Sequence, residues 1–326
     1  MTRRTFIADA THSGTILSSL RSWMPGTSWS EARKILHGRR VAINGALCLD
    51  EARRLTPGET VTLADRALPP PPRDEDVAIR FIDGSLVVVE KPSGMLTLRR
   101  LSEQGWTAQR RGLQPTLDEV IPRLIAQHAA HKTGSRVKRS RIPRLYPVHR
   151  IDRDTSGLLV IARSDEARQI LISQFAEHKA VRTYLAIVPG HPKSQTICTQ
   201  LIRDRGDGLR GSTSDASIGQ QAVTHIKNLR KIGAYSELEC RLETGRTNQI
   251  RIHLAEMGHP VCGDVKYRGP FGEPPREDAS GSPRLALHAT RLQLAHPETG
   301  ETLDYESPWP SDMQRLLERL AAKGET

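Results

Sequence analysis

Apolar positions near the start of the chain recur at helical spacing. A first helix is expected before Pro25-Gly26, with its apolar side formed by Ile16, Leu17, Leu20 and Trp23. A second helix is expected over Glu31–Leu36, capped by Ser28 or Ser30 and stopped by Gly38.

Extended segments follow these two helices. Val41–Ile43 has the pattern of a short strand, and Asn44-Gly45 directly after it is a strong signal for a hairpin turn. A return strand is expected at Val61–Leu63. We therefore predict a small α/β domain over residues 1–65, followed by a stiff, exposed, proline-rich linker over residues 66–76.

The remaining residues, 77–326, have the pattern of a second and larger domain. Apolar runs of strand type occur at residues 86–90, 157–162 and 184–188, and a helix capped by Ser164 is expected over residues 165–178. Residues 237–242 alternate between polar and apolar, which is typical of a half-exposed antiparallel strand. We predict an α+β domain with a mixed, mainly antiparallel sheet.

Length and composition exclude several classes of protein. The 326 residues suffice for about two domains, and no apolar run approaches the roughly 18 to 20 residues of a membrane-spanning helix. The start carries no pattern of a secretory signal, so the expected location is the cytoplasm. The four cysteines are widely spaced and form no C-x-x-C pair, so reduced structural thiols are expected rather than a metal site.

Charge favours a polyanionic partner. The formal net charge is +11, and residues 99–145 contain eleven lysines and arginines against three acidic residues. This basic insertion is either a solvated surface without a partner or a surface that contacts phosphates. Within it, the candidate phosphate contacts are Lys138, Arg139 and Arg141.

The run from His149 to Leu159 holds the first candidate for chemistry. Asp152 is flanked by Arg150 and Arg153, and such a carboxylate is expected to remain ionised, with its pKa lowered by the guanidinium groups. It would be available as a nucleophile or base, although a purely structural Asp–Arg pair fits this segment equally well. Ser156 lacks the preceding glycine of a G-x-S-x-G nucleophile elbow.

A second candidate segment runs from Leu242 to Asp264. Thr247 is expected to cap a helix that ends at Gly258, with Ile250 and Leu254 on its apolar side. Arg246 and Arg251 then lie near the start of the helix, where they could meet a phosphate or a carboxylate. Taken alone, the segment could also be an amphipathic helix with solvated charges.

In their order along the chain, these segments resemble the RluA-type family of pseudouridine synthases. The resemblance spans about residues 78–310 and rests on runs at residues 90–94, 149–159, 181–188 and 245–254, together with Leu287-His288-Ala289, His296-Pro297 and Ser307-Pro308. Residues 14–64 resemble the S-four-like RNA-binding domain that precedes the catalytic domain in many of these enzymes. On its RNA-facing helix and the following turn, the candidate contacts are Arg33, Lys34, Arg39 and Arg40.

The resemblance implies roles for individual residues. Asp152 matches the essential catalytic aspartate, Arg251 the arginine that pairs with it, and Tyr184 the aromatic residue that packs against the target uracil. Arg150 matches an arginine that helps to displace the base, although a plain salt bridge within the loop fits it equally well. Ile250, Ile252 and Leu254 match apolar positions around the pocket, where a role in the core alone is equally consistent, and Lys91 and Pro92 match a structural motif.

Two positions depart from the family pattern. Asn248 stands where histidine is usual and Arg182 where lysine is common, and neither is expected to touch the set of Asp152, Tyr184 and Arg251. The basic insertion is also longer than a minimal member needs, which leaves the choice of RNA open.

The implied function is isomerisation of uridine to pseudouridine in structured RNA. The S-four-like domain favours large-subunit ribosomal RNA, by family analogy alone. Transfer RNA as the substrate, or a catalytically silent RNA-binding or ribosome assembly factor, are the alternatives. No cofactor, metal or membrane is implied, and a monomer is expected. An RNA hydrolase would need a second carboxylate, a metal cluster or a nucleophile elbow, none of which is visible in the sequence.

Overall fold

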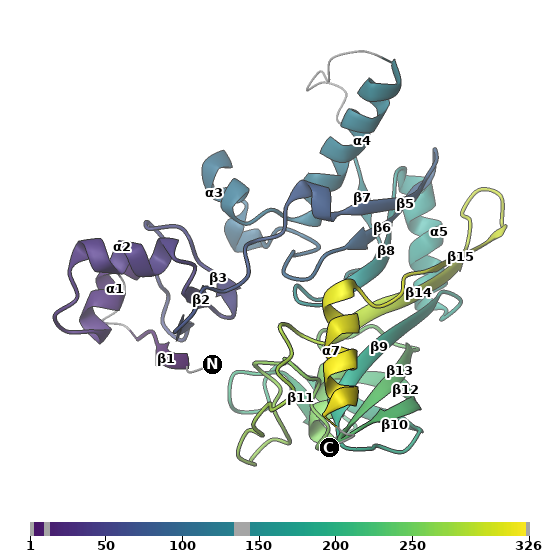
Figure 1. The fold of residues 1–326 in the computed structure, drawn as a ribbon. Coiled ribbons are helices and arrows are strands. Elements are labelled where there is room, and N and C mark those ends of the chain that lie inside the picture. The colour runs from purple at the N-terminus through teal and green to yellow at the C-terminus, as the bar shows by residue number, and fades with distance from the viewer. Residues whose placement is uncertain (1–2, 10–13, 134–143, 324–326) are drawn as a thin grey trace. The chain divides into compact units, whose positions relative to one another are not determined.

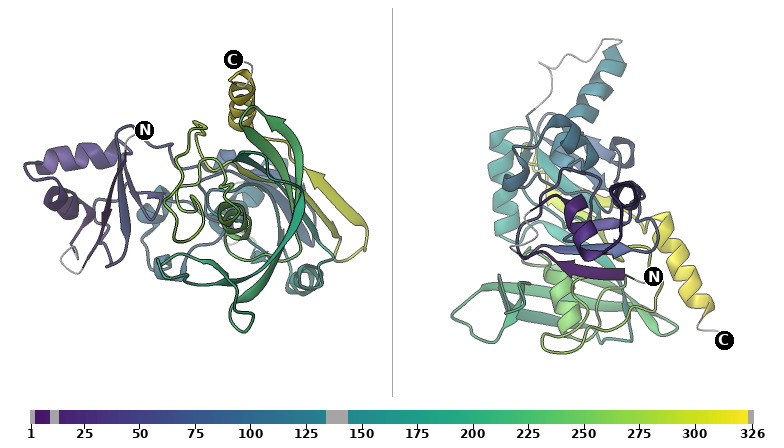
Figure 2. Two further views of the ribbon diagram at one scale, coloured as in Figure 1. Left: turned by 90° about the horizontal axis from the view of Figure 1, so that it is seen from below. Right: turned by 90° about the vertical axis from the view of Figure 1, so that its left-hand side faces the viewer.

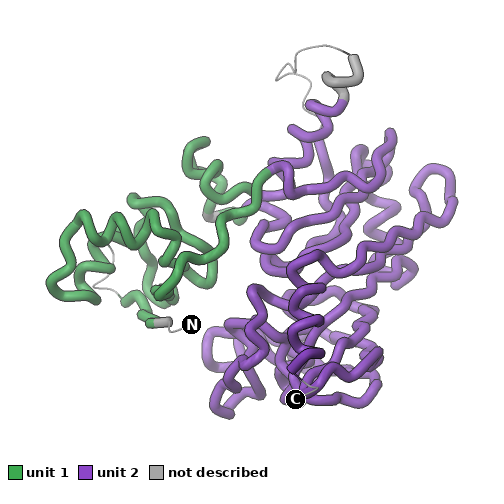
Figure 3. The backbone as a smooth tube through the Cα atoms, viewed as in Figure 1, with its two compact units in different colours: residues 1–73, 100–115 green, residues 74–99, 116–326 purple. Residues whose placement is uncertain are grey.

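A computed structural model describes residues 3–9, 14–133 and 144–323. The chain forms two compact units, each made of two stretches of sequence (Figure 3). The first unit comprises residues 1–73 and 100–115, and the second comprises residues 74–99 and 116–326.

The N-terminal stretch of the first unit forms helices α1 and α2 beside a small antiparallel sheet (Figure 1). Helix α1 spans Ile16–Trp23 and α2 spans Trp29–His37, as predicted, and the cap of α2 is Ser28, which forms a capping box with Glu31. The sheet has the order β1-β4-β2-β3, with β1 at Arg3–Ile7, β2 at Val41–Ile43, β3 at Ala46–Leu47 and β4 at Thr60–Ala64. The sequence analysis did not predict β1, which pairs with β4 at the edge.

The predicted hairpin turn is present between β2 and β3. Asn44 and Gly45 have φ of 50° and 76°, the left-handed values that both central residues of a type I′ turn require. The Asn44 side chain accepts a hydrogen bond from the Thr60 backbone N–H at 2.9 Å, which ties the turn to β4.

Residues 100–115 belong to the first unit, not to the second domain in which the sequence analysis placed them as part of the 99–145 insertion. They form a 3-10 turn, η3, at Leu101–Glu103 and helix α3 at Ala108–Leu113. Arg110 Nε pairs with Asp50 Oδ2 at 2.7 Å, and Gln114 Nε2 donates to the Leu47 carbonyl at 2.8 Å. These contacts join a segment from the middle of the chain to the N-terminal sheet.

The second unit is built on an 11-stranded sheet. Its main path has the order β11-β10-β12-β13-β9-β14-β8-β6-β5, while β15 pairs with β14 and β7 with β8. All neighbours are antiparallel except β14 and β8, so the predicted α+β class with a mixed, mainly antiparallel sheet is confirmed. The strands are β5 Ala78–Ile82, β6 Leu86–Lys91, β7 Tyr146–Pro147, β8 Ser156–Ala162, β9 Val181–Pro189, β10 Gln195–Ile202, β11 Gly211–Thr213, β12 Gln220–Ile232, β13 Tyr235–Leu242, β14 Leu287–Ala295 and β15 Thr302–Glu306.

Helices pack on this sheet. Helix α5, capped by Ser164 as predicted, lies against β7 and β8, α7 lies against β12, and α6 lies against β11 and β12 (Figure 2). The helical segments are η2 Asp74–Asp76, α4 Leu117–Thr133, α5 Asp165–Ala176, α6 Gln249–Glu256 and α7 Ser311–Ala322. The buried side chains between sheet and helices form the main core of the unit, which includes Ile151, Tyr184, Ile250 and Leu254.

A glycine at the start of β8 fixes where the loop over residues 148–155 meets the sheet. Gly157 has a φ of 112°, and a Cβ there would lie 2.2 Å from the carbonyl oxygen of Ala289 in β14. Only glycine permits this close approach of the two strands. The loop that carries Asp152 therefore joins the sheet at a fixed position, the start of β8.

Candidate active site

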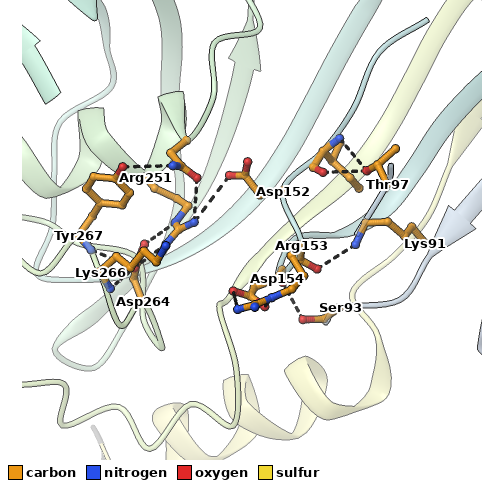
Figure 4. A network of polar contacts seen from close by, with 12 residues as sticks. Lys91, Ser93, Thr97, Asp152, Arg153, Asp154, Arg251, Asp264, Lys266 and Tyr267 are labelled. Atoms are coloured by element: carbon orange, nitrogen blue, oxygen red, sulfur yellow. Dashed lines mark hydrogen bonds and ion pairs between the residues drawn. The ribbon is translucent and has the colours of Figure 1, made fainter. Parts of the chain in front are cut away.

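Asp152 and Arg251 come from distant parts of the sequence and meet in the second unit. Asp152 lies in the loop between β7 and β8, and Arg251 lies in the first turn of α6 (Figure 4). Arg251 Nη1 is 3.8 Å from Asp152 Oδ2, and the two side chains are 7% and 20% exposed. The predicted pairing of these residues is therefore present as an ion pair, at a separation too long for a direct hydrogen bond.

A second carboxylate holds Arg251 more closely. Arg251 donates from Nε and Nη2 to the two oxygens of Asp264, at 2.6 and 2.8 Å. The Asp264 side chain is fully buried, and its Oδ1 also accepts from the backbone N–H groups of Lys266 and Tyr267, at 2.8 and 3.0 Å. The sequence analysis missed Asp264. The signal for it was that a buried arginine requires a compensating carboxylate.

Asn248 also contacts Arg251, so the expectation that it would not touch the catalytic set is wrong. Its Oδ1 accepts from Arg251 Nη1 at 2.9 Å, while its Nδ2 donates to the Tyr267 hydroxyl at 3.1 Å. Asn248, rather than the predicted Thr247, is the N-cap of α6, with a left-handed backbone at φ 60° that asparagine tolerates well. Its side chain makes no capping bond, which leaves it available to Arg251.

The direction of the Asp152 pKa differs from the prediction. Burial raises the pKa of the Asp152 carboxyl above its ordinary value, and this outweighs the opposing effects of Arg251 and Arg150. Arg153, expected beside it, instead pairs with Asp154 at 2.8 Å, and that guanidinium holds the pKa of Asp154 down against the effect of burial. The reason for the difference is the depth of the loop, which flanking sequence does not reveal.

Lys91 binds backbone carbonyl groups on both sides of the site, including one in the loop that carries Asp152. It is fully buried at the end of β6, and its Nζ donates to the carbonyls of Pro92, Met95 and Arg153 at 2.8, 2.8 and 3.0 Å. Burial lowers the pKa of Lys91 to about 7. The hydroxyl of Thr97 donates to the Ile151 carbonyl at 2.8 Å, on the other side of Asp152. Lys91 thus links two chain segments by their backbones, which agrees with the structural role implied for it.

Tyr184 lies on β9, opposite Cys240 of β13 and Ala289 of β14. Its side chain is 6% exposed, and burial raises the pKa of its hydroxyl, with a smaller contribution from the negative charge of Asp152. Ile250 and Leu254 are buried in the same core cluster as Tyr184. The three residues therefore belong to one apolar core, and Tyr184 lies near enough to Asp152 to be influenced by its charge.

Arg150 and Arg246 lie at the surface, unlike Arg251. Arg150 is exposed immediately before Ile151. Arg246 is exposed in the turn before α6, where its Nε donates to the Gln221 carbonyl at 3.0 Å. Arg182, the second departure from the family pattern, donates to the Glu243 carbonyl at 2.9 Å and lies over the ring of Phe175.

The predicted RNA contacts of the first unit lie in and directly after α2. Arg33 and Lys34 are exposed, and Arg33 Nε is 3.0 Å from Glu51 Oε2. Arg39 and Arg40 are half-buried, and Arg40 Nε donates to the Ala64 carbonyl at 2.8 Å. Three further candidates, Lys138, Arg139 and Arg141, lie outside the described residues.

Among the described residues, none of the helices has the length and apolar character of a membrane-spanning segment. No group of three or more His, Cys, Asp or Glu side chains among those residues is arranged to hold a metal ion.

Comparison with known proteins identifies the family of the chain. Residues 85–256, more than half of the chain, match the family described as RNA pseudouridylate synthase. The chain is 35% identical over 282 residues to the ribosomal large subunit pseudouridine synthase D of Zymomonas mobilis subsp. mobilis, covering 85% of this chain and 84% of the relative. It is 34% identical over 291 residues to the uncharacterized RNA pseudouridine synthase YlyB of Bacillus subtilis strain 168, covering 87% of each chain.

A solved structure supports the fold. The human protein RNA Pseudouridylate Synthase Domain Containing 4 matches with a TM-score of 0.55 and 22% identity, over 74% of this chain and 92% of that one. The match over residues 85–256 and the relatives at 34 to 35% identity confirm the family resemblance of the motifs, and the chain belongs to the RNA pseudouridylate synthase family.

Proposed function

We propose that this synthase isomerises uridines in large-subunit ribosomal RNA, with Asp152 as the essential carboxylate. The observation that carries the proposal is an aspartate, 20% exposed, whose carboxylate lies 3.8 Å from the buried guanidinium of Arg251 and near enough to Tyr184 to influence the pKa of its hydroxyl. The choice of RNA is supported by the Zymomonas relative, whose name specifies the large ribosomal subunit and which the chain matches over most of its length.

The reaction explains the composition of the site. The uracil must be detached from its sugar at nitrogen, turned and rejoined through carbon, so the site has to hold a free base away from water. The nucleotide leaves its stack at a cost of a few kcal/mol, which stacking on an aromatic side chain and phosphate contacts offset. In this proposal Tyr184 packs against the uracil, and Ile250 and Leu254 shape the apolar wall behind it.

Asp152 acts on the sugar or on the base. It serves either as the nucleophile that displaces the glycosidic nitrogen or as the base that removes a sugar proton to start glycal formation. Both routes require the ionised carboxylate, and Arg251 favours that form by its positive charge, as Arg150 does from the surface. The reaction consumes no oxidant, reductant or group donor, so no cofactor is part of the proposal.

The first unit supplies RNA affinity. We assign its helices and hairpin to an S-four-like RNA-binding domain, in which the exposed side chains of Arg33 and Lys34 contact phosphates. Arg39 and Arg40 act at the end of the same helix, and Lys138, Arg139 and Arg141 are further candidate contacts to phosphates. Arg246, exposed in the turn before α6, is suited to a phosphate of the flipped nucleotide. We further propose that the protein acts as a monomer.

Tritium release tests this proposal. Transcripts of large-subunit ribosomal RNA and of transfer RNA, labelled with tritium at carbon 5 of uracil, are treated with the wild-type protein and with Asp152→Ala. Release from the ribosomal transcripts by the wild type alone is expected. Release from transfer RNA only would move the substrate to that class, and equal release by the variant would remove Asp152 from the reaction.

A further inference from the structure

We propose that the exposed ring of Phe271 is a stacking platform for an unpaired base of the substrate RNA, and that Arg205 is the positioning residue that holds this ring. The inference rests on the proposed function only in taking RNA as the substrate. It names a part of that substrate, beyond the target uridine, that the chain contacts.

Phe271 lies in a closed loop between α6 and β14. It is 54% exposed, whereas the other three phenylalanines of the chain are half-buried. The Arg276 N–H donates to the Arg268 carbonyl at 2.8 Å and closes the loop around Phe271, and the Arg276 side chain donates to the Gly258 carbonyl just after α6. A single exposed ring is ordinary on a protein surface, so its supports are what distinguish Phe271.

Arg205, in the loop between β10 and β11, supports this ring. Its guanidinium carbon lies 5.1 Å from the centre of the Phe271 ring and 5.9 Å from the centre of the Tyr267 ring, and both distances suit a cation–π contact. The Arg205 side chain is 9% exposed, and its Nη1 has no hydrogen-bond partner among the described residues. A buried donor without a partner costs free energy, so this side chain gives up a hydrogen bond to lie against the two rings.

The turn that carries Arg205 is itself fixed. Arg205 Nε and Nη2 donate to Asp207 Oδ2 at 3.2 and 3.0 Å, and Asp207 Oδ1 accepts from the Leu209 N–H at 3.0 Å. The Arg205 N–H donates to the Leu209 carbonyl at 2.8 Å. A Cβ at Gly206 would lie 3.4 Å from Phe271 Cζ, so the tip of the ring lies against this turn. The orientation of the ring is therefore set before any RNA binds.

Tyr267 connects Phe271 and Arg205 with the candidate active site. The tyrosine is 1% exposed and packs against α6 in a small apolar core. Its ring lies 5.1 Å from the Arg251 guanidinium carbon, and Arg251 lies between Tyr267 and Asp152 (Figure 4). Two side chains, Arg205 and Tyr267, thus link Phe271 to Arg251, and a nucleotide near the target uridine is the part of the RNA that meets the exposed ring.

An unpaired nucleobase fits this surface better than a protein partner does. A flipped uridine leaves its neighbouring bases without one stacking partner, and an aromatic side chain supplies a replacement face. The guanidinium beside the ring and the formal net charge of +11 favour a polyanion. An apolar protein contact needs a larger patch than one ring, and the next residues of the loop, Gly272, Glu273 and Pro274, are exposed without forming one.

Substitutions of Phe271 test the platform through the Kd of a large-subunit ribosomal RNA transcript, measured by filter binding at fixed salt. Phe271→Ala and Phe271→Leu both lack a ring, so each is expected to raise Kd about tenfold. Phe271→Trp is expected to keep Kd at or below the wild-type value, because it offers a larger aromatic face. Ile170→Ala is the control and is expected to leave Kd unchanged, since Ile170 is an exposed apolar residue of α5.

Two further measurements separate stacking from a general contact to phosphates. A blunt-ended RNA duplex offers phosphates but no unpaired base, so its Kd is expected to be the same for the wild type and Phe271→Ala. Arg205→Gln is expected to raise the Kd of the ribosomal transcript several-fold and to have no further effect when combined with Phe271→Ala, because Arg205 acts through the ring. The slope of log Kd against log salt is expected to stay unchanged in Arg205→Gln.

The outcomes keep this inference separate from the proposed function, because binding requires no turnover. An unchanged Kd in Phe271→Ala, or an equal rise for the transcript and the duplex, overturns the platform even if the wild type releases tritium. Additive effects of Arg205→Gln and Phe271→Ala overturn the positioning role of Arg205. Binding that depends on the ring, in a protein that releases no tritium, supports the platform and removes only the proposed reaction.

Discussion

The charged residues around Asp152 and those of α2 show two different uses of charge in one chain. Arg251 and Asp264 are buried and paired with each other, Asp264 also accepts from two backbone N–H groups, and Asp152 lies 3.8 Å from Arg251. Arg33 and Lys34 are exposed, and the recorded ion pair of Arg33 is with a solvated glutamate, Glu51. Buried charges suit chemistry, because their geometry and pKa are set in advance, whereas exposed charges suit salt-dependent contacts to phosphates.

The largest effect is expected on turnover, from substitution of Asp152. Asp152→Asn keeps the shape of the side chain but removes the ionised oxygen, so tritium release is expected to fall on the order of a thousandfold or more. RNA affinity, measured by filter binding at fixed salt, is expected to stay within about twofold of the wild type. Wild-type turnover by this variant would contradict the proposal that Asp152 is the essential carboxylate.

The next effect tests whether the aromatic ring or its hydroxyl matters. Tyr184→Ala removes a ring that is 94% buried and is expected to cost about 3 kcal/mol of unfolding free energy, together with a large loss of turnover. Tyr184→Phe keeps the ring and is expected to retain much more of both. Urea unfolding and single-turnover tritium release measure the two quantities. Equal damage by the two substitutions would show that the hydroxyl, not packing, is the important group.

A smaller effect is expected on stability, from the buried and uncharged side chain of His288. His288 is fully buried between Ser156 and Ser307, and burial lowers its pKa from 6.5 to about 4. Between these values the unfolded chain binds a proton that the native protein does not, so the free energy of unfolding falls as the pH falls, by at most about 1.4 kcal/mol per pH unit.

The test is the pH dependence of His288→Asn. The stability advantage of the wild type over this variant is expected to be full at pH 7 and to shrink by roughly 1 to 2 kcal/mol at pH 5, as measured by urea unfolding. His178→Asn is the control, because His178 is exposed and its left-handed backbone at φ 58° also suits asparagine. A constant difference between wild type and His288→Asn at both pH values would contradict the prediction.

The smallest effect is expected on RNA binding, from the exposed charges of α2. Substitution of both Arg33 and Lys34 by glutamine is expected to weaken RNA binding several-fold and to reduce the slope of log Kd against log salt by about 1 to 2, while kcat stays unchanged. Arg168→Gln on α5 is the matched control, because Arg168 is also exposed and paired with a solvated carboxylate, Asp165. A fall in kcat without a change in the salt slope would contradict the assignment of these exposed charges to phosphate binding.

Local structure followed closely from local sequence. The capping box of Ser28 and Glu31, the Asn44-Gly45 turn and the Ser164 cap of α5 each depend on residues within a few positions of one another, and each is present. Strand β1 was missed because its pairing with β4 spans more than 50 residues and its own short pattern is weak. Residues 100–115 were placed in the wrong unit for the same reason, since Arg110 and Asp50 meet only in the folded chain.

By itself, the sequence determined the fold class, the family and the identity of Asp152, Tyr184 and Arg251 as candidates, because these depend on periodicity and on motifs that are continuous along the chain. Only the tertiary structure decided that Arg251 binds Asp264 more tightly than Asp152, that Asn248 joins them, and that burial raises the pKa of Asp152. These properties depend on distance and desolvation between segments about a hundred residues apart, and neither quantity is written in the order of the residues.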